Sequence, residues 1–220
     1  MSENQTATQL ARPYIDQIAS VSPTPGGGSA SAVAGSIGTG LLEMIATLSL
    51  NTATGESKEV LDDLIPIFNR SRSVLLELGG EDEKAYGGYR AALTLPKGTA
   101  AEKTARKTAL QDALIHATAV PLETAELALE LMQLVPALAE VASSHLEADL
   151  TVATALIGAS INGSVALVNA NLPLIKDEDA QDEISDRVEQ ILATFTEIIE
   201  SEWDELQDDE DEDGDEEEDE

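Results

Sequence analysis

The sequence predicts an all-α protein: an up-and-down bundle of about six long helices with a buried apolar helix at its centre. Two observations carry this prediction. Hydrophobic residues make up 42% of the 220 residues but aromatic residues only 3%, so the core must consist of Ala, Leu, Ile and Val. That composition suits close-packed helices better than sheets. No segment shows the polar–apolar alternation of a half-buried strand.

The expected helices follow from apolar periodicity and from the positions of proline and glycine. We expect helices over about 7–20, 29–51, 56–78, 81–94, 99–134, 137–171 and 178–206. The segment 29–51 is apolar almost all round, which favours the centre of a bundle over a membrane span, and Ser29 is expected to cap it. Gly79-Gly80 should break or bend the third helix, and Thr99 with Glu102 forms a predicted capping box.

Charge divides the chain into one helical domain, 1–207, and an acidic tail, 208–220, expected to be disordered. The net charge is −31, and the tail holds twelve acids, so the domain alone still carries −19. Such acidity argues against nucleic-acid binding, which needs basic patches. It favours adaptation to a salt-rich cytoplasm over a simple solubility effect.

The chain has no cysteine, which excludes disulfides and thiolate metal sites and fits a reducing compartment. Its N-terminus has no basic region followed by an apolar run, so we expect no signal peptide and a cytoplasmic location without membrane attachment. His145 and Asp149 share a helix face but have no third partner in view, so no metal is expected.

A glycine-rich turn, Pro23-Thr24-Pro25-Gly26-Gly27-Gly28, precedes the central helix. Backbone N–H groups at a helix N-terminus favour an anion or a carbonyl oxygen. The turn matches neither the P-loop nor the dinucleotide-binding fingerprint. Taken alone, it is more typical of tight packing than of a ligand site.

Six of the twelve basic residues fall between positions 84 and 107. Lys103, Arg106 and Lys107 are spaced i, i+3, i+4 and so share one helical face. In a chain this acidic, the cluster indicates an anionic small ligand, although pairing with nearby acids such as Glu102 and Asp112 explains it equally well.

A second stripe consists of Asp82, Tyr86, Tyr89 and Arg90, which also share a helical face. A carboxylate beside aromatic rings is suited to acid/base chemistry on a flat heterocycle. The alternative is a half-buried helix with an exposed aspartate.

These segments, in register, resemble the cyclodeaminase domain of formimidoyltransferase-cyclodeaminase and the related stand-alone methenyltetrahydrofolate cyclohydrolases. The resemblance spans about residues 10–200. It rests on Ser22-Pro-Thr-Pro-Gly-Gly-Gly-Ser29, Glu81-Asp82-Glu-Lys-Ala-Tyr86, Leu95-Pro96-Lys97, Glu102-Lys103-Thr-Ala-Arg106, Val120-Pro121-Leu122, Ala148-Asp149-Leu150-Thr-Val152, Asn171-Leu172 and Asp177. Two positions depart from the family pattern: Ala142-Ser143 stands for Gly-Asn, and Leu167 stands for an Asn.

The resemblance implies an all-helical homodimer with a folate site near the subunit interface, and no bound cofactor apart from a tetrahydrofolate derivative as substrate. It implies catalytic roles for Asp82 and Lys97. The implied substrate-binding residues are Pro25, Gly26, Gly27, Gly28, Tyr86, Arg106, Asp149 and Asn171.

The activity we favour is a cyclohydrolase that opens 5,10-methenyltetrahydrofolate to 10-formyltetrahydrofolate, because no formimidoyltransferase domain is attached to feed a deaminase. The alternatives are a formimidoyltetrahydrofolate cyclodeaminase that releases ammonia and a non-catalytic, folate-binding or structural helical dimer.

Overall fold

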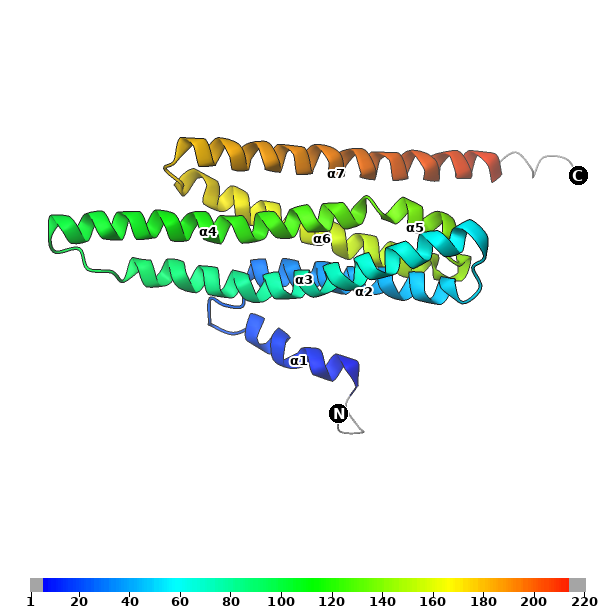
Figure 1. The fold of residues 1–220 in the computed structure, drawn as a ribbon, viewed down its shortest axis with the longest axis horizontal. Coiled ribbons are helices and arrows are strands. Elements are labelled where there is room, and N and C mark those ends of the chain that lie inside the picture. Colours follow the sequence, from blue (N-terminus) through cyan, green and yellow to red (C-terminus); the bar gives the residue numbers. More distant parts are fainter. Residues whose placement is uncertain (1–5, 214–220) are drawn as a thin grey trace, which may run out of the picture.

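The computed structural model describes residues 6–213, with the backbone alone for residue 7 and for 201–213. Figure 1 shows a bundle of long helices that run alternately in opposite directions, which confirms the predicted all-α class. The α-helices are α1 (Ala7–Ile18), α2 (Gly27–Leu50), α3 (Gly55–Leu93), α4 (Ala100–Met132), α5 (Val135–Val141), α6 (Glu147–Asn171) and α7 (Glu178–Asp213). Two short 3₁₀ turns, η1 (Ser144–Leu146) and η2 (Leu172–Leu174), flank α6.

The centre of the bundle is the contact between α2 and α6, and glycine makes this contact close. A Cβ on Gly35 would lie 2.7 Å from Ser160 Oγ, and one on Gly38 would lie 2.8 Å from the carbonyl oxygen of Ala153. Both distances are shorter than van der Waals contact, so the two helix backbones could not approach this closely with larger residues. Helices α3 and α4 flank this pair, and α7 packs along α4 (Figure 1).

Two segments are long and apolar enough to cross a membrane by length and composition: α2 and the stretch Ser144–Leu174 that contains α6. A core helix of a globular protein meets the same criteria. Each packs against the other and against α4, and each buries 44% of its most apolar window within the bundle. The central position expected for the second helix is therefore confirmed.

Helix α3 is continuous across Gly79-Gly80, so the expected break there is wrong. Each glycine costs a helix about 1 kcal/mol relative to alanine. Burial of Leu75, Leu78 and Ala85 on either side of the pair outweighs that cost. The capping box at the start of α4 is confirmed, since Glu102 N–H donates to Thr99 Oγ1 at 3.2 Å and Thr99 N–H donates to Glu102 Oε2 at 2.8 Å.

The single helix expected over 137–171 is divided, because the chain leaves helical geometry at Ala142, where ψ is 150°. The next residue, Ser143, donates its N–H to Ser49 Oγ at 2.9 Å, near the end of α2. That bond ties the break to the core. At the C-terminus, α7 extends to Asp213, beyond the expected domain end at 207, and residues 214–220 of the expected tail lie outside the described part.

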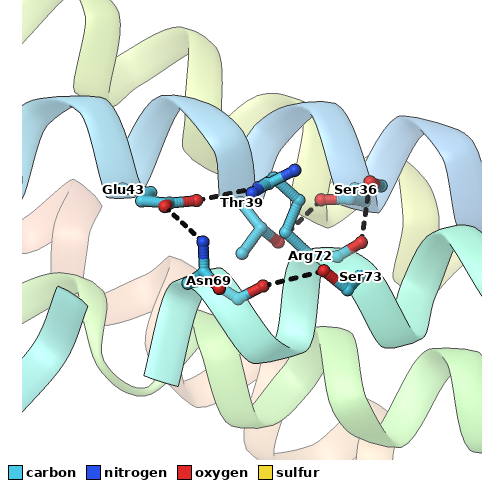
Figure 2. Close-up of polar contacts among 7 residues, drawn as sticks. Ser36, Thr39, Glu43, Asn69, Arg72 and Ser73 are labelled. Atoms are coloured by element: carbon cyan, nitrogen blue, oxygen red, sulfur yellow. Dashed lines mark hydrogen bonds and ion pairs between the residues drawn. The ribbon is translucent and has the colours of Figure 1, made fainter. Parts of the chain in front are cut away.

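Figure 2 shows the polar network that joins α2 to α3 along one side of the bundle. Glu43 accepts hydrogen bonds from Asn69 at 2.7 Å and from Arg72 Nε at 2.8 Å. Burial raises the pKa of Glu43, but the two hydrogen bonds and the charge of Arg72 outweigh burial, so its pKa is lower than usual. Ser36 Oγ donates to the Arg72 carbonyl at 2.9 Å, which fixes the register of the two helices.

Candidate active site

A cavity of about 280 Å³ opens where the N-terminus of α2 meets α3, α4 and the C-terminal end of α6. Its walls come from five parts of the chain. They are Pro23, Thr24, Gly26, Gly27 and Gly28 in the turn, Asp82, Tyr86 and Tyr89 on α3, Leu114, Ala117 and Pro121 on α4, Leu167 and Asn171 on α6, and Leu174 on η2. The glycine turn and the Asp82 stripe, 54 residues apart between Gly28 and Asp82, therefore form one site.

Asp82 is held at the N-terminus of α2. Its Oδ2 accepts the backbone N–H of Ser29 at 3.1 Å. A Cβ on Gly28 would lie 2.0 Å from Asp82 Oδ1, so only glycine leaves room for the carboxylate there. The N-cap residue of α2 is Gly26, which has no side chain to accept a hydrogen bond from the first turn. Asp82, on α3, supplies that acceptor instead.

The expected cap role of Ser29 is wrong, because Ser29 lies inside the first turn of α2 and its hydroxyl points to other partners. Ser29 Oγ lies 3.0 Å from the Tyr14 hydroxyl and 3.4 Å from Glu83 Oε1. The residue is 1% exposed. Ser29 is thus a buried junction between α1, α2 and α3.

The environment of Asp82 raises its pKa above the ordinary aspartate value. Burial is the main cause, and the negative charge of Glu83 adds to it, whereas the hydrogen bond from Ser29 opposes both. A carboxyl group with a raised pKa exchanges a proton near neutral pH more readily than an ordinary aspartate. The residue is therefore suited to general acid/base chemistry.

The remaining walls of the cavity are mainly apolar or aromatic. Tyr86 and Tyr89 follow Asp82 along the same face of α3, whereas Leu114 and Leu167 contribute from α4 and α6. Asn171 is the amide group in the wall, and its Nδ2 donates to the Ala117 carbonyl at 3.5 Å. A flat, mostly apolar molecule with one reactive polar edge matches these walls.

A second pocket, of about 310 Å³, lies beside the first and is strongly basic. It is lined by Lys97, Lys103, Arg106, Lys107, Leu110, Gln111 and Lys176. Five of the chain's twelve basic residues therefore converge on one hollow, and none of the five forms a salt bridge with a side chain of residue 6 or residues 8–200, the part whose side chains are described. Arg106 Nη2 donates to the Leu93 carbonyl at 3.1 Å, while its buried Nε has no hydrogen-bond partner among the described residues.

The two pockets lie along the same helix, α4. Leu110 and Gln111 line the basic pocket, and Leu114, one turn further on, lines the cavity of Asp82. Gln111 braces the boundary, because its Nε2 donates to the Leu174 carbonyl at 3.2 Å and its Oε1 accepts the Lys176 N–H at 2.7 Å.

The structure brings six of the expected site residues to the cavity: Gly26, Gly27, Gly28, Asp82, Tyr86 and Asn171. Lys97 and Arg106 line the basic pocket instead. Pro25 is buried within the turn, where its peptide bond with Thr24 is cis.

Asp149 lies in the first turn of α6, 22 residues before Asn171 and about 33 Å away along the helix. It is therefore remote from this chain's cavity. Arg90 is also absent from the cavity walls. Asn162, another amide side chain of α6, donates to the Gly158 carbonyl at 3.0 Å and does not line the cavity. No group of three or more potential metal ligands occurs among the side chains that the structure describes, those of residues 6 and 8–200.

Sequence reasoning missed two kinds of site residue. Leu114, Ala117 and Leu174 are apolar wall residues with no distinguishing local pattern. Tyr14 and Glu83 approach the site through Ser29, and only the folded contacts reveal them. The one available signal for Glu83 was its position directly after Asp82.

The fold and the site together define a class of protein: an all-helical bundle with a carboxylate in a mostly apolar cavity and a basic pocket beside it. The chain belongs to the formiminotransferase-cyclodeaminase family, whose sequence profile matches residues 11–190. It is 32% identical to a methenyltetrahydrofolate cyclohydrolase of Methylorubrum extorquens, over 82% of this chain and 87% of that protein.

Other relatives are larger. The chain is 29% identical to the formimidoyltransferase-cyclodeaminase of Sus scrofa, over 82% of this chain but only 34% of that protein. Among solved structures, a formiminotetrahydrofolate cyclodeaminase of Thermotoga maritima superposes with a TM-score of 0.73. That match covers 90% of this chain and 93% of the other at 24% identity, and it supports the fold.

Proposed function

We propose that this chain is a methenyltetrahydrofolate cyclohydrolase, which adds water to the one-carbon bridge of 5,10-methenyltetrahydrofolate and opens it to 10-formyltetrahydrofolate. The observation that carries the proposal is the half-buried Asp82 carboxylate, held at the α2 N-terminus in a mostly apolar cavity. The cyclohydrolase relative supports this choice, because the match extends over most of both chains.

The cavity suits the charge and shape of this substrate. The methenyl bridge joins N5 and N10 and carries a positive charge, which the Asp82 carboxylate complements. The flat pterin lies against the tyrosine-bearing wall of α3, where Tyr86 and Tyr89 line the cavity. Asn171 is placed to hydrogen-bond a polar edge of the ring.

Hydrolysis then needs one group that moves protons at the bridge carbon. Asp82 accepts a proton from water as the water oxygen bonds to the bridge carbon, which gives a neutral tetrahedral carbinol. The carbon–N5 bond then breaks, N5 takes the proton from Asp82, and the carbinol oxygen loses its own proton to become the formyl oxygen. One water is consumed and one proton is released.

The basic pocket is our proposed site for the glutamate carboxylates at the other end of the folate. Lys107 and Leu114 stand seven residues apart on α4, or about 10 Å, so the pocket lies within reach of a ligand seated beside Asp82. Arg106 has a buried Nε donor there with no hydrogen-bond partner among the described side chains. We assign Lys97 and Arg106 to this carboxylate site.

The second candidate function is the formimidoyltetrahydrofolate cyclodeaminase, and the likeness to the larger Sus scrofa protein favours it. In that reaction the same carboxylate donates a proton to the departing ammonia. Release of ammonia from formimidoyltetrahydrofolate distinguishes this activity from hydrolysis of methenyltetrahydrofolate. A chain that binds a reduced folate and performs neither reaction would be the non-catalytic protein.

A homodimer forms part of the proposal. Apolar side chains lie exposed on one side of α2, with Ile37, Met44 and Leu48 at 55%, 37% and 45% exposure. On α6, Val152 is 51% exposed. A second copy packed on α2 and α6 would remove this surface from water. Light scattering after size-exclusion chromatography should give about twice the 23.2 kDa chain mass, and a monomer for Met44→Asp.

We further propose that the protein acts in a salt-rich cytoplasm. The net charge of −31 is spread over the whole chain, and twelve basic residues offset only part of it. Concentrated salt screens the resulting self-repulsion.

The decisive experiment follows the near-ultraviolet absorbance of methenyltetrahydrofolate in high salt with purified full-length protein. We expect hydrolysis by the wild type and a loss of about 10²–10⁴-fold for Asp82→Asn, the range typical of a removed acid/base group. Asp63→Asn, an exposed change on the same helix, is the matched control. Equal rates for Asp82→Asn and wild type would contradict the assignment of Asp82.

A further inference from the structure

Beside Asp82 lies a second carboxylate, Glu83, which takes no part in the proposed proton transfers. Both belong to α3 and both meet the first turn of α2, but they contact different atoms of Ser29. Asp82 Oδ2 takes the backbone N–H at 3.1 Å, and Glu83 Oε1 takes the hydroxyl at 3.4 Å. One buried residue therefore fixes two neighbouring negative groups.

The Ser29 hydroxyl has a further partner in Tyr14, whose hydroxyl oxygen lies 3.0 Å from Ser29 Oγ. Tyr14 belongs to α1, which stands off from the long helices of the bundle (Figure 1). Its neighbours Leu10 and Ile15 are 57% and 58% exposed, whereas Tyr14 itself is half-buried. Tyr14 is thus the side chain through which α1 makes hydrogen-bond contact with the bundle, among the residues described.

We propose that Glu83, held by the Ser29 hydroxyl, is a positioning residue that increases the proton affinity of Asp82 for the proposed reaction. Because Ser29 contacts both carboxylates, it holds Glu83 at a fixed distance from Asp82. Tyr14 in turn holds the Ser29 hydroxyl from the α1 side, with the two hydroxyl oxygens 3.0 Å apart. The inference rests on the proposed function for its catalytic consequence.

The charges around Asp82 support this assignment. The negative charge of Glu83 contributes to the raised pKa of Asp82, after burial. Burial also raises the pKa of Tyr14, and the charges of Glu83 and Asp82 add to that effect against the Ser29 hydrogen bond. Tyr14 therefore remains a neutral hydroxyl. From α3, Tyr86 and Tyr89 also face the cavity, whereas α2 and α6 contribute no titratable side chain to its walls.

Glu81, on the other side of Asp82 in sequence, gives a matched comparison. Its carboxylate bonds Lys84 at 3.0 Å and lies 3.6 Å from His116 Nε2 on α4, and neither partner lines the cavity. Lys84 and His116 lower the pKa of Glu81. Glu81 and Glu83 are each one residue from Asp82, but only Glu83 shares its anchor.

The test compares Glu83→Gln with Glu81→Gln in the full-length protein. Gln at 83 keeps an acceptor for Ser29 but removes the charge. We expect the acidic limb of the pH profile of kcat/KM to move to lower pH by about half a unit for Glu83→Gln, and to stay in place for Glu81→Gln. Ser29→Ala, which keeps the backbone N–H to Asp82, should move the limb in the same direction, and Tyr14→Phe should do so to a smaller extent.

A second readout does not depend on activity. The carboxyl carbon of Asp82, followed by ¹³C NMR during a pH titration, should titrate at lower pH in Glu83→Gln than in wild type and in Glu81→Gln. An unmoved titration in Glu83→Gln, or equal shifts in the two glutamine variants, would overturn the inference. A wild type whose Asp82 responds to Glu83 but that hydrolyses no methenyltetrahydrofolate would leave this inference intact and refute the proposed function.

Discussion

Replacing Gly28 with alanine should abolish most activity while leaving the protein folded. The new Cβ would lie 2.0 Å from Asp82 Oδ1 and 2.3 Å from Asp82 Cγ. Restoring an ordinary contact of 3.4 Å requires the carboxylate to move by about 1.4 Å, which lengthens the 3.1 Å bond to Ser29 N–H beyond hydrogen-bonding range.

The magnitude follows from that displacement. A hydrogen bond to a charged group contributes about 1.5–3 kcal/mol, which corresponds to roughly 10- to 150-fold. A misplacement of about 1 Å in a catalytic group can cost 10²-fold by itself. We therefore expect kcat to fall by about 10²–10³-fold. Stability should change little, because alanine favours the helix by about 0.5–1 kcal/mol and the lost cap costs about 1 kcal/mol.

The assay measures kcat and KM from the decay of methenyltetrahydrofolate absorbance and Tm from thermal unfolding of the same samples. Gly80→Ala is the control, since a Cβ there meets nothing within 4 Å and the residue is exposed on α3. It should keep wild-type kcat. A Gly28→Ala protein with kcat within about threefold of wild type would refute the reasoning. Catalysis would then not depend on the position in which Gly28 and Ser29 hold the Asp82 carboxylate.

Three further predictions concern charge. Lys107→Ala should raise KM by up to about fivefold with little effect on kcat, as expected for loss of a partly exposed ion pair with a ligand carboxylate. The control Lys58→Ala, at the far end of α3, should change neither constant. A lowered kcat in Lys107→Ala would contradict a role in binding alone. Because folding raises the pKa of Asp82, ionisation of that group destabilises the native state above its pKa. Asp82→Asn should therefore have the higher Tm at neutral pH, and the difference should close as pH falls through the raised pKa toward the ordinary aspartate pKa. Tm of the wild type should rise with added KCl, since the salt screens the net charge of −31, and a Tm that falls would count against adaptation to salt.

The fold was accessible from sequence because its determinants are local or periodic. The apolar pattern of α2, the capping box at Thr99 and the shortage of aromatic residues each indicate helices without knowledge of neighbours. The break at Ala142 was missed because its stabilising bond comes from Ser49, far away in sequence. The continuity of α3 through Gly79 was missed for the same reason, since burial in the bundle decided it.

The site divides in the same way. Asp82, Tyr86 and the three glycines could be selected by residue type and spacing, and the structure places them together. The grouping of Lys97 and Arg106 with Lys176 depends on the packing of η2 beside α4, which no local pattern reveals. The role of Ser29 as a junction depends on contacts with two other helices.

Because residues of α4 line both pockets, the length of that helix sets the distance between them. Leu110 and Gln111 mark one end of the measured interval, and Leu114 and Ala117 mark the other. An inserted residue between them would add about 1.5 Å and rotate everything beyond it by about 100°, so the two hollows would no longer open on the same side. The relative placement of the two pockets is therefore more sensitive to a change in the length of this interval than to a change of side chain within it.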